Sequence, residues 1–240
     1  MSKEHHALIT GASRGLGLAI AERLRADGVP VIGISRKAPA DFPGAYFEAD
    51  LASPSETAKV LSVILGSFTV TRLVNNVGTV FAEKLGEIDL ERMAQLFDLN
   101  LRTAVQMTQA VLPGMRSQGF GRIVNISSIT VLGFPERTSY AASKAALISF
   151  TRTWALELAR TGITVNAIAP GPTETELFRV NNPPGSIGEA RYLAIVPMQR
   201  LGRPAEIAAA AAYLMSEDAG YVTGQTIFVD GGASIGRSYV

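Results

Sequence analysis

The stretch Ala7-Leu-Ile-Thr-Gly-Ala-Ser-Arg-Gly-Leu-Gly17 joins a short apolar run to a glycine-rich turn, and the predicted fold follows from it. The apolar run at 7–10 is typical of a buried strand, and the periodic segment behind the turn is typical of a helix. Gly11, Gly15 and Gly17 permit a tight turn, and the helix N-terminus behind them offers free N–H groups to a pyrophosphate. A turn in this position indicates a dinucleotide site, although its spacing, Gly-x-x-x-Gly-x-Gly, differs from the common Gly-x-Gly-x-x-Gly.

Strand and helix patterns alternate outward from this stretch along the whole chain. Short, continuously apolar strands between helices are typical of a parallel sheet that helices cover on both faces. Helices are predicted behind the glycine turn and at about 55–65, 90–118 (interrupted near Asp98), 140–160 and 204–216. Later strands are predicted at 30–35, 45–49, 72–76, 122–126, 163–167 and 226–229. We therefore predict an α/β fold, a single Rossmann-type doubly wound domain over residues 1–240, with a mostly parallel, seven-stranded sheet.

Composition argues against several classes of function. Hydrophobic residues make up 47% of the 240 residues, charged residues make up 18%, and the formal net charge is +1. Without concentrated positive charge, sequence-independent binding of nucleic acid is not expected. The chain has no cysteine, and its two histidines, His5 and His6, are too few for a multi-histidine metal site, so no metal site is predicted. No apolar run approaches the ~20 residues of a membrane helix and no signal-peptide pattern is visible, so we expect a cytoplasmic protein without a membrane partner.

Tyr140 and Lys144 lie four residues apart in Ser139-Tyr-Ala-Ala-Ser-Lys144, inside a predicted helix. Residues at this spacing share a helix face, and an ammonium beside a phenol lowers the phenol pKa from its usual ~10. Such a tyrosine can exchange a proton near neutral pH, as general acid–base catalysis requires. The spacing alone fits a packed tyrosine beside a solvated lysine equally well, so other motifs must decide between the two interpretations.

Several further motifs follow the glycine turn in a fixed order. They are Asn75-Asn-Val-Gly78, Asn100 in Phe97-Asp-Leu-Asn100, Ser127-Ser128, Tyr140 with Lys144, Pro170-Gly171 and Val229-Asp-Gly-Gly232. With these motifs, over nearly all of its length, the chain resembles the short-chain dehydrogenase/reductase family, and its most similar well-known members are the 3-oxoacyl-(acyl-carrier-protein) reductases. Val77 departs from the alanine that is usual in the family's Asn-Asn-Ala-Gly motif.

The resemblance implies a set of catalytic residues. Tyr140 would be the general acid in carbonyl reduction, and Lys144 would lower the Tyr140 pKa and bind the nicotinamide ribose. Asn100 would hold a water in the proton relay. A serine would hydrogen-bond the carbonyl oxygen, a role of the oxyanion-hole type. We favour Ser128, twelve residues before Tyr140, over Ser127, which has the family's more usual spacing of about thirteen.

The resemblance also implies a nicotinamide cofactor, and the residues after the second strand indicate which one. An acidic side chain there would bind a ribose 2′-hydroxyl and repel a 2′-phosphate. The chain instead has Ser35 followed by Arg36, with Arg14 in the glycine turn, and guanidinium groups suit a phosphate. We therefore predict NADP(H), the alternative being that both arginines are ordinary surface charges. The predicted cofactor residues are Gly11, Ser13, Arg14, Gly15, Leu16, Gly17, Ser35, Arg36, Asp50, Leu51, Asn76, Val77, Gly78, Tyr140, Lys144, Pro170, Gly171, Thr173 and Thr175.

Two side chains near this predicted site also have structural explanations. Asp50 can cap the helix that begins near Pro54, although it lies a few residues early. Asn75 can bridge neighbouring strands through its side chain, and we weigh that role equally with a functional one.

By the same resemblance, residues 176–200 form a lid over the substrate, and lids of this kind close over bound substrate. The predicted pocket residues are Ile129, Val131, Phe134, Leu177 and Phe178, each of which could also be simple core packing. The broad apolar faces at 101–115 and 145–158, with Trp154, are expected to form a homodimer or homotetramer contact or else an intrachain face.

The predicted function is NADP(H)-dependent transfer of hydride between nicotinamide and a ketone or secondary alcohol. Carbonyl reduction is favoured, with a 3-oxoacyl thioester as one candidate substrate. An acidic acyl-carrier protein is a candidate partner, and Arg122 could help to dock it. A dehydrogenase of cyclic diols or secondary-metabolite alcohols stays open. A non-catalytic NADP-binding sensor would commonly lack the tyrosine or the lysine, and an epimerase would need a larger C-terminal portion.

Overall fold

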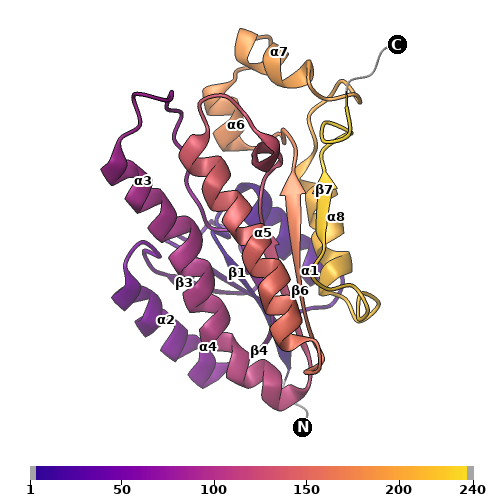
Figure 1. The fold of residues 1–240 in the computed structure, drawn as a ribbon. Coiled ribbons are helices and arrows are strands. Elements are labelled where there is room, and N and C mark those ends of the chain that lie inside the picture. The colour runs from indigo at the N-terminus through magenta and orange to yellow at the C-terminus, as the bar shows by residue number, and fades with distance from the viewer. Residues whose placement is uncertain (1–3, 237–240) are drawn as a thin grey trace.

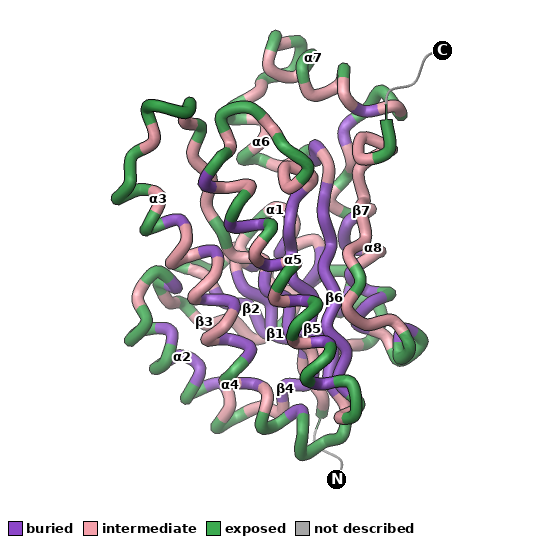
Figure 2. The backbone as a smooth tube through the Cα atoms, viewed as in Figure 1, coloured by how far each residue is buried: buried purple, intermediate pink, exposed green. Residues whose placement is uncertain are grey.

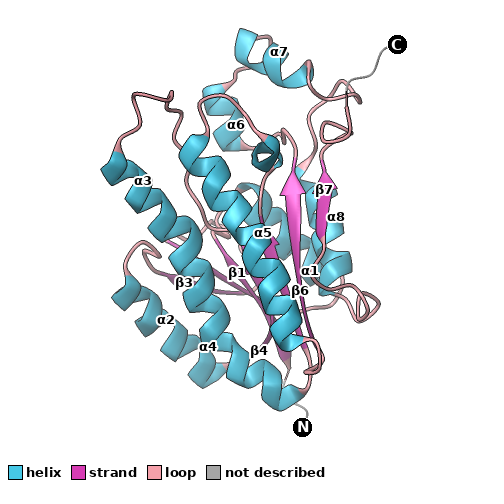
Figure 3. Ribbon diagram, in the orientation of Figure 1, coloured by secondary structure: helices cyan, strands magenta, loops and turns pink. Residues whose placement is uncertain are grey.

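The computed structural model describes residues 4–236, and at its centre lies a sheet of seven parallel strands (Figure 1, Figure 3). The strand order is β3-β2-β1-β4-β5-β6-β7. The order reverses between β1 and β4, and in open α/β sheets ligands bind outside the carboxyl ends of the strands at such a point. The predicted doubly wound fold is therefore confirmed. The strands are β1 (His5–Thr10), β2 (Val31–Ser35), β3 (Ala45–Glu48), β4 (Thr69–Asn75), β5 (Gly121–Ile126), β6 (Ile163–Pro170) and β7 (Thr226–Val229).

Helices cover both faces of this sheet (Figure 1). One face packs against α1 and α8, and the other packs against α2, α4 and α5. Among residues 4–236, no helix is long and apolar enough to cross a membrane. The helices are α1 (Gly15–Ala26), α2 (Pro54–Ser67), α3 (Leu90–Phe97), α4 (Thr103–Gln118), α5 (Thr138–Leu158), α6 (Glu176–Asn181), α7 (Ile187–Leu193) and α8 (Pro204–Met215), with a π-helical turn η1 (Asp98–Arg102) and a 3-10 turn η2 (Ile129–Leu132).

The strands at the middle of the sheet are buried on both faces, and Figure 2 shows them in purple beneath a greener layer of helices. Because successive side chains of a strand point to opposite faces, neighbouring residues enter different cores. Ile9 lies in the core beneath α1 and α8, and Leu8 lies in the core beneath α2, α4 and α5. All eight residues of β6 are buried, as expected of a central parallel strand.

The element boundaries agree with the sequence patterns to within a few residues, with instructive exceptions. The interruption predicted near Asp98 is the π-helical turn η1, which joins α3 to α4. His5 and His6, expected to precede the first strand, form its first two residues. The short helices α6 and α7 were not predicted, because neither is long enough to show a full helical period.

The amino ends of β4 and β5, remote from the carboxyl edge, hold a pair of arginines that bind the end of α8. Arg72 Nε donates to the carbonyl oxygen of Met215 at 2.8 Å, and Arg122 Nε donates to that of Ser216 at 2.9 Å. Cations at a helix C-terminus complement its dipole and satisfy its last carbonyls. Both guanidinium groups lie over the ring of Phe120, with the Cζ of Arg72 4.9 Å and that of Arg122 4.3 Å from the ring centroid.

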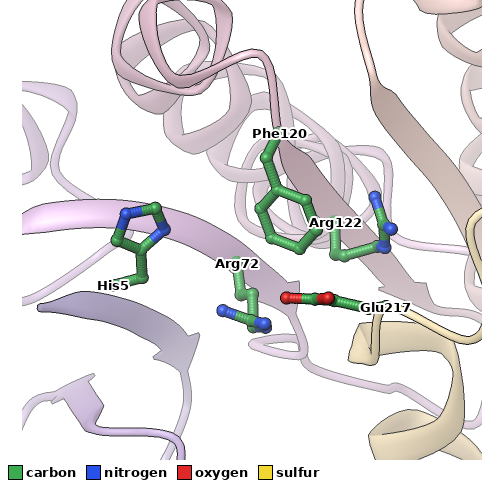
Figure 4. Close-up of a pocket in the computed structure, with 5 residues that line it drawn as sticks. All are labelled: His5, Arg72, Phe120, Arg122 and Glu217. Carbon is green, nitrogen blue, oxygen red and sulfur yellow. The ribbon is translucent and has the colours of Figure 1, made fainter.

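These arginines line a cavity of about 450 Å³ together with His5, Phe120 and Glu217 (Figure 4). Burial lowers the pKa of both guanidinium groups, and the charge of Glu217 partly offsets that effect. Arg122 is only 4% exposed, and its Nε and Nη1 donate to carbonyl oxygens of the chain. The prediction that Arg122 docks an acidic carrier protein is therefore wrong, because this side chain is buried at the opposite end of the sheet from the predicted site.

Candidate active site

The glycine turn after β1 is held against the carboxyl end of β4. The amide Nδ2 of Asn76 donates to the carbonyl oxygens of Thr10 at 2.9 Å and Gly11 at 3.2 Å. Gly11 has a φ of +66°, and a Cβ there would lie 3.0 Å from Asn76 Nδ2. A Cβ at Gly17 would lie 2.3 Å from the Gly11 carbonyl oxygen. These two positions require glycine, and the donors of Asn76, predicted to bind cofactor, hold the turn in place.

The N-terminus of α1 fits the pyrophosphate of a dinucleotide. The N-cap residue Arg14 has no capping side-chain hydrogen bond, and the first turn has no acidic residue. The first N–H groups of a helix have no partner within the helix, so these can bind an anion. Gly15, with a φ of +58°, leaves the approach to this turn without a side chain. Leu16 instead packs against the core beneath α1.

Tyr140 and Lys144 lie one turn apart on α5, close to the end of β5. Lys144 Nζ is 5.7 Å from the centroid of the Tyr140 ring and donates to the Ile126 carbonyl oxygen at 2.8 Å. An ammonium has three donors, so two stay available for ribose hydroxyls. Lys144 is 4% exposed, and its burial lowers its pKa from 10.5 to about 8.

The pKa of Tyr140 differs in direction from the prediction. Burial, the largest cause, raises the pKa above its ordinary value of 10, and the electrostatic interaction with Tyr192 raises it further. The hydrogen bond with Ser128 and the charge of Arg137 lower it by less. The expected lowering by Lys144 is not found, because burial of the phenol dominates. Tyr140 therefore carries its proton at neutral pH.

The two serines at the end of β5 have different partners. Ser127 Oγ is buried and donates to the main-chain carbonyl of Lys144 at 2.9 Å. Ser128 Oγ accepts from the Thr130 amide at 3.2 Å and from Thr130 Oγ1 at 3.0 Å, which leaves its own hydrogen for another partner. It also lies within hydrogen-bonding reach of Tyr140. This geometry favours Ser128 as the serine that binds a carbonyl oxygen.

Asn100 lies in η1 and is 2% exposed. Its Nδ2 donates to the Thr79 carbonyl oxygen at 3.1 Å and to Ser143 Oγ at 3.0 Å, while its Oδ1 accepts from the Thr79 amide at 2.8 Å. Gly78 makes this approach possible, since a Cβ there would lie 3.0 Å from Asn100 Oδ1 and 3.4 Å from Lys144 Nζ. Both hydrogens of its amide group are therefore occupied, so Asn100 could hold the predicted water only through an acceptor, on its side chain or its main chain.

Residues predicted to bind the adenosine half lie around the ends of β2 and β3. Ser35 Oγ is 2.5 Å from the hydroxyl of Tyr46, a residue that the sequence analysis did not select. Arg36 is exposed, whereas Arg14 forms an ion pair of 3.6 Å with Glu176 at the start of α6. Exposed pairs of this kind are weak, so Arg14 is able to turn to an anion.

The structure tests the structural explanations offered for Asp50 and Asn75, and it shows where Leu51 lies. Ser53, and not Asp50, is the N-cap of α2, and Asp50 Oδ1 accepts from the Ala52 amide at 3.0 Å. Leu51 is buried in the core. Asn75 Nδ2 donates to Asn125 Oδ1 at 2.8 Å, so it bridges β4 and β5. The structural explanation therefore holds for Asn75.

The predicted nicotinamide segment continues from β6 toward the lid. Gly171 packs closely, since a Cβ there would lie 2.6 Å from Asp230 Cα. Thr173 is buried and donates to the Gly171 carbonyl oxygen at 2.9 Å. Thr175 Oγ1 caps α6, and its methyl group would lie 3.7 Å from a Cβ at Gly15. The segment that ends β6, from Pro170, therefore lies against the glycine turn, and the hydroxyl of Thr175, which accepts from the Phe178 amide, keeps its own hydrogen for another partner. Val77, at the end of β4, packs against the core beneath α4 and donates its amide to Thr10 Oγ1.

Aromatic side chains join the predicted lid to the segment after η2. Phe134 stacks on Tyr192 of α7 with ring centroids 5.5 Å apart, and Phe178 of α6 meets the same ring edge-on at 5.2 Å. Tyr192 also affects the pKa of Tyr140, so it lies near that phenol. Tyr192 is not among the predicted pocket residues, because α7 was not predicted. Ile129 and Val131 in η2 are half-buried, whereas Leu177 is 50% exposed.

Comparison with known proteins agrees with this arrangement. A family model described as enoyl-(acyl carrier protein) reductase matches residues 11–234. The 3-oxoacyl-(acyl-carrier-protein) reductase of Vibrio cholerae is 39% identical over 236 residues, which cover 94% of this chain and 96% of that protein. The aldohexose dehydrogenase of Thermoplasma acidophilum has a similar structure, with a TM-score of 0.89 and 30% identity over 99% of this chain and 96% of that one.

A further similar structure, from Beutenbergia cavernae, is provisionally assigned as an NAD(P)-dependent gluconate 5-dehydrogenase with NADP bound at low occupancy. Its TM-score is 0.89 at 31% identity, with 97% of each chain covered. The fold, the ordered motifs and the matched length together show that this chain belongs to the short-chain dehydrogenase/reductase family of oxidoreductases.

Proposed function

We propose that the protein is an NADP(H)-dependent reductase that converts a ketone to a secondary alcohol, with a 3-oxoacyl thioester as its substrate. The observation that carries the proposal is the grouping of Ser128, Tyr140 and Lys144 at the carboxyl ends of the strands, beside the glycine turn. A raised Tyr140 pKa suits reduction, because the phenol holds the proton that the product alcohol needs.

In this mechanism the chain binds the carbonyl oxygen and delivers a proton to it. Ser128 donates a hydrogen bond to the oxygen and stabilises the negative charge that develops there. Tyr140 donates its proton to the same oxygen. Lys144 binds ribose hydroxyls with its two remaining donors, and its charge stabilises the phenolate that proton transfer leaves behind. When bound, the nicotinamide supplies the hydride.

The preference for NADP(H) rests on the residues at the adenosine end. Arg36 is exposed directly after Ser35, and Arg14 is held only by a weak, exposed ion pair. Guanidinium groups bind phosphate through charge-assisted hydrogen bonds. The similar structure from Beutenbergia cavernae binds NADP, which supports the same choice here.

The choice of an acyl substrate over a sugar rests on the predicted lid, residues 176–200. Tyr192 of this lid meets the ring of Phe178 edge-on and stacks on Phe134 from the segment after η2. The surfaces of these rings are largely apolar. An acyl chain gains from burial against such rings, whereas a polyol needs convergent polar groups. The relative from Vibrio cholerae, which is a 3-oxoacyl-(acyl-carrier-protein) reductase, supports this class. An acyl-carrier protein as the carrier of the substrate and a cytoplasmic location stay predictions.

We propose self-association through α4 and α5. Met107, Val111 and Met115 of α4 face the intrachain core, so most of that apolar face is used within the chain. On α5, however, Leu156 is 82% exposed, and the stacked rings of Phe150 and Trp154 lie on another face of the same helix. A large apolar side chain exposed on the surface of α5 suits a contact with a second copy.

The experiment that tests the function measures NADPH oxidation with a short 3-oxoacyl thioester, with NADH in parallel. Wild-type protein should turn over with NADPH and much more slowly with NADH. Tyr140→Phe should lower kcat at least about 10²-fold, the size of a general acid–base contribution, while the Kd for NADPH stays within about threefold. Tyr213→Phe, on exposed α8 surface, is the matched control. Turnover by Tyr140→Phe at the wild-type rate would contradict the mechanism.

A further inference from the structure

The phenol of Tyr46 joins two segments that the proposed cofactor site brings together. Its hydroxyl is 2.5 Å from Ser35 Oγ at the carboxyl end of β2 and 3.3 Å from the carbonyl oxygen of Lys37. It also forms a side-chain hydrogen bond with Ser13 in the glycine turn. Three hydroxyl groups, from Ser13, Ser35 and Tyr46, therefore meet between the glycine turn and Arg36.

The position of Tyr46 is fixed by the sheet beneath it. In the parallel pairing of β2 with β3, Tyr46 lies opposite Gly33. A Cβ at Gly33 would lie 2.7 Å from the rings of both Tyr46 and Phe42, so glycine makes room for them. The two rings meet edge to face with centroids 4.8 Å apart. The ring of Tyr46 is therefore rigid, and little entropy is lost when its hydroxyl binds a ligand.

The hydroxyl cluster is suited to an acceptor. Burial, the largest cause, raises the pKa of Tyr46, so its hydroxyl keeps its hydrogen at neutral pH. Ser35 donates to the Lys37 carbonyl oxygen at 3.0 Å, and a hydroxyl can rotate from such a partner to a stronger one. The nearest carboxylate, that of Glu48, accepts from the Ala38 amide at 2.9 Å. A phosphate accepts hydrogen bonds only, and those from a neutral donor to an ionised group are among the stronger ones.

We infer that Tyr46 is a specificity-determining residue, whose hydroxyl binds the 2′-phosphate of the cofactor together with Ser13 and Ser35. The inference rests on the proposed NADP(H) preference and extends it to a residue of β3. The arginines supply charge from the exposed side, and the half-buried hydroxyl cluster forms the floor of the same site. No covalent step is involved.

The test measures the binding of two probes to the full chain by isothermal titration calorimetry. The probes are adenosine 2′,5′-bisphosphate and adenosine 5′-monophosphate, which differ in the 2′-phosphate. Tyr46→Phe keeps the ring and removes only the hydroxyl, and Tyr213→Phe on α8 is the matched control. We expect Tyr46→Phe to raise the Kd of the bisphosphate about tenfold, the size of one hydrogen bond to a charged group. The Kd of the monophosphate should stay within about twofold, as should both values for Tyr213→Phe.

The outcomes separate this inference from the proposed function. If wild-type protein binds both probes equally, the NADP(H) preference fails, and the inference fails with it. If wild-type protein prefers the bisphosphate and Tyr46→Phe keeps that preference, only the role of Tyr46 is overturned. If Tyr46→Phe weakens both probes equally, the residue acts in general packing and the inference is also wrong. Ser35→Ala is a second test, since it should reduce the preference for the bisphosphate without altering an aromatic ring.

Discussion

The hydroxyl of Ser127 donates a 2.9 Å hydrogen bond to the main-chain carbonyl of Lys144. In the opposite direction, Lys144 Nζ donates 2.8 Å to the carbonyl oxygen of Ile126. Two consecutive residues at the end of β5 thus bind the two ends of one lysine. These two bonds hold α5 against the end of β5. Ser127 therefore has a structural role in this contact, which Ser128 does not share.

Substituting each serine separately should divide these roles. We expect Ser128→Ala to lower kcat about 10²- to 10³-fold, as removal of one oxyanion-hole donor does elsewhere. The loss of its bonds from Thr130 at the start of η2 should cost about 1 kcal/mol of unfolding free energy as well. Ser127→Ala should remove the side-chain bond to the Lys144 carbonyl, which keeps only its helical partner, and cost about 1 kcal/mol of unfolding free energy, while kcat falls less than about tenfold. Steady-state kinetics and denaturant unfolding of the two variants provide the comparison. The reverse pattern would make Ser127 the catalytic serine.

Gly78 should tolerate no side chain. A Cβ there would press on Asn100 Oδ1 at 3.0 Å and on Lys144 Nζ at 3.4 Å. We expect Gly78→Ala to displace both groups, at a cost of about 1–3 kcal/mol, and to lower kcat/KM more than about tenfold. Gly114→Ala on α4 is the control, because a Cβ there meets nothing within 4 Å. Equal activity of the two variants would show that the close approach at Gly78 does not matter for catalysis.

The buried ammonium of Lys144 should make stability depend on pH. Its pKa is lowered from 10.5 to about 8 by burial, so between these values the unfolded chain holds a proton that the folded chain has released. Stability therefore rises with pH across this window, and the penalty is full below about pH 8. From about pH 7.5 to about pH 9.5 the gain should be roughly 2 kcal/mol relative to Lys144→Met. Denaturant unfolding of both proteins at the two pH values measures this gain. An equal change in unfolding free energy for the two proteins would contradict the burial of a titrating lysine.

The exposed side chain of Leu156 should hold protomers together. Leu156→Glu places a charge where α5 is proposed to meet its copy, so we expect a lower molar mass by light scattering at micromolar concentration. Val63→Glu, which alters a 56% exposed residue of α2, serves as the control for an added charge. A monomeric wild-type protein, or an unchanged mass for Leu156→Glu, would exclude this contact.

The sequence predicts most of the fold because periodicity and turn chemistry agree along the chain. The strand at residues 226–229 is found with the same bounds, and the interruption near Asp98 is the π-helical turn. The glycine turn was recognisable because Gly11 and Gly17 occupy positions that a Cβ would block. The spacing of these glycines is local, so a single sequence can reveal it, although Asn76, which also crowds both positions, is distant in the chain.

What the sequence could not predict depends on contacts between distant segments. Tyr46 and Tyr192 come from β3 and α7, and only the folded chain brings them to Ser35 and Tyr140. The direction of the Tyr140 pKa was also missed, because the effect of a neighbouring charge is visible in the spacing whereas the depth of burial is not. The burial of Arg122 could not be predicted for the same reason, since nothing in its local sequence shows that the end of α8 packs against it.

The two edges of the sheet have different roles, and the guanidinium groups that bind the end of α8 belong to the structural one. At the amino edge, Arg72 and Arg122 fasten a helix with bonds that no substrate touches. At the carboxyl edge, Ser128 and Tyr140 lie within hydrogen-bonding reach of each other, where the proposed mechanism needs donors for a carbonyl oxygen. Substitutions could therefore accumulate around the lid, and change which ketone is reduced, while the opposite edge maintains the scaffold.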